Sequence, residues 1–206
     1  MTTSASASPT DQELRLLGDL RGKRILDLGS GAGGPAVAFA QLGAIVIALD
    51  TTDERLARAR AHAEEAEVKV EWRTGDLADL AFLRAESIDA AFSGGAVAEV
   101  DDASRLFRQV QRVLKPSAPF VFSFDHPLAL CIDDAGVVSR SYFDPGPIDV
   151  DRDGEHARIH VRDIGQVFTE LGRAGFRVDT ILEPRPATPG ARLPESIVWR
   201  ARKEGA

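Results

Sequence analysis

Short apolar runs alternate with longer, helix-like segments through the middle of the chain. Runs of roughly four to eight apolar residues bounded by polar turns are typical of strands buried on both faces of a parallel sheet. Such runs predict strands at Arg24–Leu28, Ile45–Leu49, Val68–Trp72, Ile88–Phe92 and Phe120–Phe124. Apolar residues spaced three and four apart predict the intervening helices at Pro35–Gln41, Asp53–Ala66 and Ala103–Leu114. This alternation indicates an α/β fold.

The pattern continues on both sides of this block. Thr10, with Glu13 three residues later, forms a capping-box sequence that predicts a helix at Asp11–Leu17. The later elements are a helix at Arg162–Arg173 and strands at Phe176–Leu182 and Ser196–Ala201. Two consecutive strands joined by a turn pair antiparallel. We therefore expect a doubly wound, mostly parallel seven-stranded sheet with a C-terminal antiparallel hairpin, which is a Rossmann-like arrangement.

The length and composition suit a single domain. The chain has 206 residues, of which 44% are hydrophobic, enough for a substantial core. We expect this domain to cover residues 10–206. Residues 1–9 are mostly Ser, Thr and Ala, a composition that predicts a disordered tail. Residues 125–157 are rich in prolines and acids and have little periodicity, so we expect an inserted loop, and a loop of this length is usually functional.

The charge balance excludes two classes of partner. Lys and Arg number 25 against 32 Asp and Glu, which gives a formal net charge of −7. Such a surface repels phosphate backbones and anionic lipids, so we expect neither nucleic acid nor membrane as a partner. Cys131, the single cysteine, cannot form an internal disulfide, and the N-terminus lacks the pattern of a secretory signal. The protein is therefore expected in the cytoplasm.

A glycine-rich segment follows the first predicted strand and leads into a helix. It reads Asp27-Leu28-Gly29-Ser30-Gly31-Ala32-Gly33-Gly34. Glycines at this point let the backbone turn sharply and let a ligand approach without meeting a Cβ atom. Asp50 ends the second predicted strand, where a carboxylate can accept hydrogen bonds from both ribose hydroxyls of an adenosine. The two signals together predict an adenosine-binding site.

The glycine spacing alone leaves more than one ligand open. Gly29, Gly31 and Gly34 also satisfy G-x-G-x-x-G, the fingerprint of NAD-binding oxidoreductases. Asp27, however, would repel two phosphates and would favour a ligand that carries an ammonium and a sulfonium. Gly75-Asp76, after the third strand, offers a carboxylate to an adenine amino group. S-adenosylmethionine is therefore favoured, and a protein that binds this cofactor without catalysis is a further alternative.

These motifs resemble those of the class I S-adenosylmethionine-dependent methyltransferases of the small-molecule type, over about residues 14–203. A Val113-Leu114-Lys115-Pro116 segment before the fifth strand adds to the resemblance. The resemblance implies methyl transfer from S-adenosylmethionine to an O, N or C atom of a metabolite, with S-adenosylhomocysteine as product. The cofactor-binding residues that it implies are Asp27, Gly29, Ser30, Gly31, Asp50, Thr51, Gly75, Asp76, Leu77, Ser93 and Gly94.

In that family, the glycine loop lies under the methionine part of the cofactor and the acid after strand two holds the ribose. Asp76 and Leu77 would contact adenine, and Ser93 and Gly94 would face the transferable methyl group. Many relatives also carry an N-terminal helical segment over the cofactor, whereas one short predicted helix precedes Lys23 here. We expect the cleft to be open, or to be covered by residues 125–157 or by a second subunit in a homodimer.

The methyl acceptor should lie beyond the carboxyl ends of strands four and five. His126 follows strand five and Glu99 follows strand four, so both are candidates for the base that removes a proton from the acceptor. Alternatively, His126 fixes the following loop and Glu99 is a solvated acid. Tyr142 and His160 are candidate substrate-binding residues. The acids near this rim do not match the magnesium site of catechol-type methyltransferases, so no metal is expected.

Overall fold

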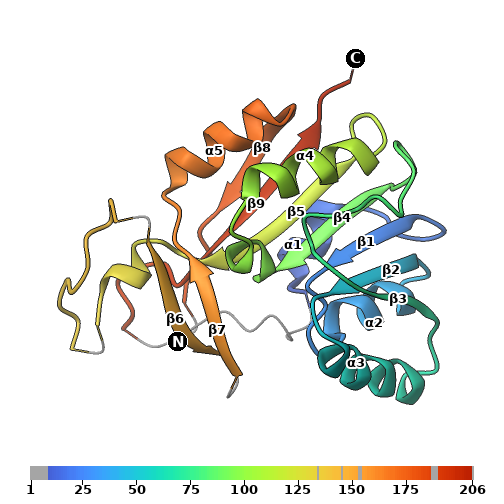
Figure 1. The fold of residues 1–206 in the computed structure, drawn as a ribbon, viewed down its shortest axis with the longest axis horizontal. Helices are drawn as coiled ribbons and strands as arrows, with labels where there is room; N and C mark the ends of the chain where they lie inside the picture. The colour runs from blue at the N-terminus through green and yellow to red at the C-terminus, as the bar shows by residue number, and fades with distance from the viewer. Residues whose placement is uncertain (1–8, 134, 145, 153–154, 187–189, 206) are drawn as a thin grey trace.

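The computed structural model describes residues 9–133, 135–144, 146–152, 155–186 and 190–205. Its centre is a seven-stranded sheet in the order β3-β2-β1-β4-β5-β9-β8 (Figure 1). The strands are β1 (Arg24–Leu28), β2 (Ile45–Asp50), β3 (Val70–Thr74), β4 (Ala90–Gly94), β5 (Pro119–Asp125), β8 (Phe176–Leu182) and β9 (Ser196–Lys203). Strands β1 to β5 pair in parallel, and β9 lies antiparallel between β5 and β8. The predicted fold class, with its C-terminal hairpin, is confirmed.

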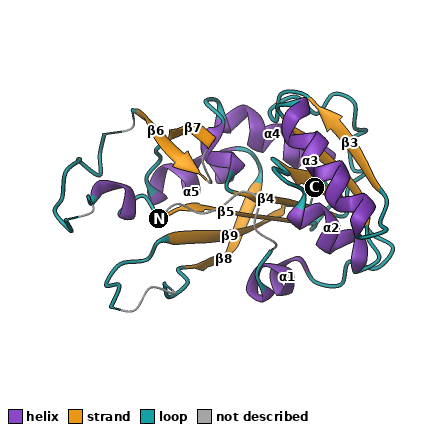
Figure 2. Cartoon of the chain, turned by 90° about the horizontal axis from the view of Figure 1, so that it is seen from below, coloured by secondary structure: helices purple, strands orange, loops and turns teal. Residues whose placement is uncertain are grey.

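Helices cover both faces of this sheet. They are α1 (Asp11–Leu17), α2 (Gly34–Gln41), α3 (Asp53–Glu65), α4 (Ala103–Val113) and α5 (Ile164–Arg173). Apolar side chains of α1 and α2 pack on one face, and those of α4 and α5 pack on the other. Figure 2 shows α1 and α5 on opposite sides of β8 and β9. Among the described residues, no helix combines the length and the hydropathy needed to cross a bilayer.

Aromatic side chains form the larger core beneath α4 and α5. The ring of Phe122 on β5 stacks on Trp199 of β9, with centroids 6.2 Å apart and planes 4° from parallel. Phe120 and Phe107 pack against the same ring. All four side chains are fully buried, and each such burial contributes about 2 kcal/mol. The core thus fixes β9 beside β5, so that the parallel part of the sheet ends at β5.

Two predicted strands begin two residues later than expected. The third runs over Val70–Thr74, because the N–H of Val68 donates to the carbonyl of Ala63 and still belongs to the turn that ends α3. The fourth runs over Ala90–Gly94, because Ile88 makes only an isolated bridge to Leu114. Both strands therefore end closer to the site than the apolar runs indicate.

The segment 125–157 is not irregular throughout. It contains the 3₁₀ turn η2 (Ala129–Cys131), the strand β6 (Pro147–Arg152) and the start of β7 (Glu155–His160). Strands β6 and β7 form a separate antiparallel hairpin, which lies beside the carboxyl ends of β4 and β5 (Figure 1). Alternate residues of the hairpin point toward the core. Ala157 and Ile159 are buried, and Ile148 packs against the larger core cluster, to which Ile159 belongs. The predicted tail, except Pro9, lies outside the described residues.

The capping box of α1 also ties this helix to the sheet. Thr10 Oγ1 accepts the N–H of Glu13 at 3.2 Å, and Glu13 Oε2 accepts the N–H of Thr10 at 2.8 Å. The second carboxylate oxygen, Glu13 Oε1, accepts the hydroxyl of Ser123 on β5 at 2.8 Å. Glu13 and Ser123 are both buried. One side chain therefore caps the helix and anchors it near the end of β5.

Replacement of Glu13 by Ala should lower the free energy of unfolding by about 2 kcal/mol, because the cap is lost and the buried hydroxyl of Ser123 loses its acceptor. Urea denaturation followed by circular dichroism measures this change. Asp11→Ala, at an exposed acid in the same helical turn, is the matched control and should shift stability by less than about 0.5 kcal/mol. Equal losses in the two variants would contradict the anchoring role.

Candidate functional site

The carboxyl ends of β1, β2 and β4 meet where the strand order reverses, which is the usual ligand position in an open α/β sheet. The glycine loop leaves β1 at this point. Gly29, Gly31 and Gly33 have φ values of 73°, 53° and 86°, in the left-handed region that glycine adopts at little cost. A Cβ atom on Gly29 would also lie 2.0 Å from the Cβ of Ala96, in the 3₁₀ turn η1 (Ala96–Glu99). Packing and backbone conformation therefore both require glycine at 29.

Asp50 joins the glycine loop to the end of β2. Its side chain is buried; Oδ2 accepts the N–H of Gly31 at 2.8 Å and Oδ1 accepts the N–H of Thr51 at 2.7 Å. A carboxylate has about four acceptor positions, so capacity remains for ligand hydroxyls. The residue predicted to hold a ribose is thus already oriented by two backbone donors.

Asp27 is the most strongly perturbed acid of the site. It is fully buried, and its Oδ2 accepts the hydroxyl of Ser30 at 2.6 Å. Burial raises the pKa of Asp27 to about 7; the Ser30 hydrogen bond opposes this shift and the nearby charge of Asp50 adds to it. Within the described part of the chain, Asp27 Oδ1 and the buried hydroxyl of Ser93 have no hydrogen-bond partner. Unpartnered buried polar atoms are costly, and these two suit a ligand that brings donors and positive charge.

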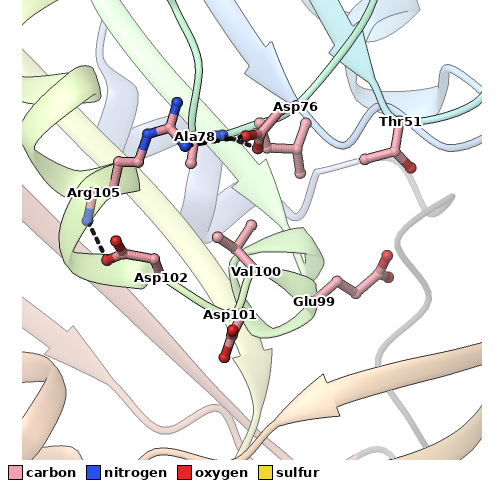
Figure 3. A pocket seen from close by; sticks show the side chains of 9 residues that line it. Thr51, Asp76, Ala78, Glu99, Val100, Asp101, Asp102 and Arg105 are labelled. Carbon is pink, nitrogen blue, oxygen red and sulfur yellow. Dashed lines mark hydrogen bonds and ion pairs between the residues drawn. The ribbon is translucent and has the colours of Figure 1, made fainter.

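A cavity of about 300 Å³ opens between the loop after β3 and the end of η1 (Figure 3). It is lined by Thr51, Asp76, Leu77, Ala78, Glu99, Val100, Asp101, Asp102 and Arg105. Asp76 Oδ1 accepts the N–H of Ala78 at 2.8 Å, and Oδ2 lies 3.6 Å from Arg105 Nη1. The cavity thus brings together three of the predicted cofactor residues, Thr51, Asp76 and Leu77, and adds Glu99 from the predicted catalytic pair.

Arg55 is a site residue that the sequence analysis missed. Its Nη1 lies 3.2 Å from Glu99 Oε2 and 3.8 Å from Asp50 Oδ1, so the guanidinium bridges the ends of β2 and β4. The guanidinium partly neutralises both carboxylates. Arg55 and Glu99 are 44 positions apart in the sequence, and no local pattern indicates that they meet. Arg55 lies in the first turn of α3, within a run of charged residues that resembles an ordinary solvated helix face.

His126 is buried after β5 and both of its ring nitrogens are engaged. Nδ1 accepts the N–H of Leu128 at 3.2 Å, so the proton belongs on Nε2, which lies 3.0 Å from Glu183 Oε1. In this arrangement His126 joins the start of the 125–157 segment to the residue after β8. It is not among the residues that line the cavity. Its catalytic role stays a prediction, and it requires one of these two contacts to open.

The two predicted substrate-binding residues lie on the 125–157 side of the site. His160 Nδ1 is 3.2 Å from Asp101 Oδ1, which lines the cavity. The half-buried Tyr142 accepts the N–H of Ile164 through its hydroxyl at 3.4 Å, and so fixes the segment to the start of α5. Among the described residues, no group of three His, Cys, Asp or Glu side chains could hold a metal ion.

Comparisons with known proteins indicate the family of the chain. Residues 26–122 match the family described as methyltransferase domain. Over 105 residues the chain is 36% identical to a ubiquinone biosynthesis O-methyltransferase of Xanthomonas oryzae pv. oryzae, a match that covers 51% of this chain and 44% of that protein. The equivalent protein of Hahella chejuensis is 36% identical over 104 residues, again with 44% of its length covered. The match thus spans less than half the length of these relatives.

Solved structures cover nearly the whole chain. An S-adenosylmethionine-dependent methyltransferase from Mesorhizobium loti superimposes with a TM-score of 0.76 at 31% identity, and the alignment covers 93% of this chain and 95% of that one. A putative S-adenosylmethionine-dependent methyltransferase from Listeria monocytogenes gives 0.78 at 23% identity, with 94% and 97% covered, and shares the fold. The chain therefore belongs to the class I S-adenosylmethionine-dependent methyltransferases. The cofactor of this family is S-adenosylmethionine, and the buried acids described above fit its charges.

The raised pKa of Asp27 has a consequence for stability. Because its folded pKa of about 7 exceeds the unfolded value of 3.8, folding is favoured most below 3.8, and stability is lost as the pH rises toward 7. Asp27→Asn removes this titration. The variant should gain about 2–3 kcal/mol more stability, relative to the wild type, at pH 8 than at pH 5. Urea unfolding at the two pH values measures the difference; the exposed Asp19→Asn serves as control, and a pH-independent gain would refute the assignment.

Proposed function

We propose that this protein transfers a methyl group from S-adenosylmethionine to an O, N or C atom of a small-molecule metabolite, and releases S-adenosylhomocysteine. The observation that carries the proposal is the pair of buried carboxylates, Asp27 and Asp50, at neighbouring strand ends around one glycine loop. One offers an unpartnered oxygen within the described residues, and the other keeps acceptor capacity for hydroxyls. A cationic adenosyl ligand satisfies both requirements.

The charge of Asp27 argues against the dinucleotide alternative. In an NAD site, the residues before the glycine loop face a pyrophosphate. A buried carboxylate at that place would repel the two phosphates in a region of low dielectric constant. The ammonium and sulfonium of S-adenosylmethionine reverse the sign of this interaction.

The roles follow from the positions of the residues. Asp50 and Thr51 would hold the ribose, and Gly75, Asp76 and Leu77 would border the adenine. The methionine part would lie against Asp27, Gly29, Ser30, Gly31, Ser93 and Gly94. The fit is supported by the cavity beside Asp76 and by the buried, unpartnered hydroxyl of Ser93 at the end of β4, within the described residues.

The bound sulfonium supplies an activated methyl group, so the protein mainly has to align the acceptor with it. A base is needed only when the acceptor must lose a proton. Both candidates already have partners: Glu99 lines the cavity and lies 3.2 Å from Arg55 Nη1, and His126 donates to Glu183 and accepts from Leu128. We retain both as proposed catalytic residues.

The acceptor is proposed to bind beyond β4 and β5, next to the 125–157 segment, with Tyr142 and His160 as contacts. Three exposed apolar side chains of this segment, Val137, Val138 and Phe143, support a homodimer that would cover this side of the cleft. The net charge of −7 and the single cysteine support a cytoplasmic protein without nucleic-acid or membrane partners.

Calorimetric titration with S-adenosylhomocysteine tests the cofactor assignment. The wild type should bind it, and Asp50→Ala should weaken binding by about 100-fold, because two ribose hydroxyls lose their acceptor. Glu54→Ala, at an exposed acid next to Arg55, is the matched control and should bind like the wild type. Absence of wild-type binding at millimolar ligand would end the proposal. Binding without methyl transfer to any acceptor in a broad panel would favour a cofactor-binding protein without catalysis.

The pH dependence of binding tests Asp27 separately. Only the ionised acid attracts the ligand ammonium, so the affinity for S-adenosylhomocysteine should rise about tenfold from pH 6 to pH 8, through the pKa of about 7. Asp27→Asn should bind more weakly at pH 8 and lose this slope, while Asp19→Asn should keep it. If Asp27→Asn retains the wild-type profile, another group controls it.

A further inference from the structure

Arg162 is a buried arginine outside the cofactor motifs. It lies between β7 and α5, with 8% of its surface exposed. Its guanidinium donates to three backbone carbonyls: His160 at 3.1 Å, Val100 at 2.5 Å and Asp101 at 2.7 Å. Burial lowers the pKa of Arg162, and the carboxylates of Glu170, Asp101 and Asp102 oppose that shift. Burying a cation costs desolvation free energy, which the three hydrogen bonds of the Arg162 guanidinium offset. This arrangement indicates a specific structural role for Arg162.

Two of the three carbonyls belong to residues that line the cavity, Val100 and Asp101. Val100 is the C-cap residue of η1 and Asp101 follows it; the carbonyl of Asp101 also accepts the N–H of Ala103 at 3.2 Å. Arg162 donates to the carbonyls of Val100 and Asp101 from 62 and 61 positions further along the chain. Both residues line the cavity together with Thr51 and Asp76; in Figure 3 the side chain of Val100 points toward Asp76, whereas the carboxylate of Asp101 points away from it. The backbone position of these two residues therefore contributes to the shape of the cavity.

This part of the cavity wall, Val100 and Asp101, is linked to the β6–β7 hairpin. The third carbonyl that Arg162 binds belongs to His160, the last residue of β7, and His160 Nδ1 lies 3.2 Å from Asp101 Oδ1. Ile159, next to it on β7, is buried in the core cluster that includes Val97 of η1. The hairpin and the wall are thus held together at one point.

We propose that Arg162 is a positioning residue, whose planar fork of donors fixes the Val100–Asp101 wall against the β6–β7 hairpin and so preforms the pocket for the adenosyl half of the cofactor. This inference rests on the proposed function. It adds a specific role for a residue that does not itself line the cavity. Lysine keeps the charge but cannot present several donors in one plane, so the geometry, rather than the charge, is the feature under test.

Titration of two ligands tests the inference: S-adenosylhomocysteine and 5′-methylthioadenosine, which carries the adenosyl half alone. Arg162→Lys should weaken both by the same factor, about tenfold or more, because the affected wall faces the shared half. Arg158→Lys is the matched control; it lies exposed on the same hairpin and should bind both ligands like the wild type. Thermal midpoints are measured for each variant, and titrations are made well below them.

Chemical rescue separates positioning from general loosening of the fold. In Arg162→Ala, guanidinium chloride at low millimolar concentration should restore affinity for both ligands, and it should have no such effect on Asp50→Ala. Wild-type affinity in Arg162→Lys, or a loss of binding that is confined to S-adenosylhomocysteine, overturns the inference. If the wild type binds neither ligand, the proposed function itself fails, so the two failures are distinguishable. Should Arg162→Ala not fold, the comparison of Arg162→Lys with Arg158→Lys decides alone.

Discussion

The carboxylate of Asp50 is the fixed point around which the site is built. By accepting the N–H groups of Gly31 and Thr51, it joins the glycine loop of one strand to the end of the next. The loop cannot change its curvature without leaving a buried charge short of donors, and such a loss is expensive. Arg55 then connects the same carboxylate to Glu99, so three strand ends share one electrostatic network.

Two buried acids of the site, Asp50 and Asp27, have different surroundings. Asp50 has two backbone donors and a guanidinium nearby, whereas Asp27 has one hydroxyl and is otherwise enclosed. A molecule that needs both acids charged at once must bring positive charge with it. A cationic ligand therefore lowers the electrostatic free energy of the two carboxylates, and the site is complementary to such a ligand in charge.

The sequence predicted the parts that local pattern encodes. The apolar runs located β1 and β8 without error, and the runs for the first three strands placed Asp27, Asp50 and Asp76 at or near strand ends. The β6–β7 hairpin was not predicted, although Ile148, Val150, Ala157 and Ile159 alternate, because Pro145, Gly146 and Pro147, at or just before its start, are residues typical of loops. Arg55 and Arg162 could not be predicted, since their partners lie 44 and about 60 positions away and tertiary packing alone brings them together.

The contact between Gly29 and Ala96 limits how the molecule can be redesigned. The methyl group of Ala96 occupies the volume that any side chain at residue 29 would need, so the glycine loop and η1 are in direct van der Waals contact. A larger side chain at residue 29 or 96 would displace the glycine loop toward the proposed cofactor site. Room for bulkier ligands would have to come from residues that line the cavity on other elements, such as Ala78 and Arg105. The contact between the glycine loop and η1 therefore limits substitution on one side of the site, whereas these other cavity-lining residues can be varied.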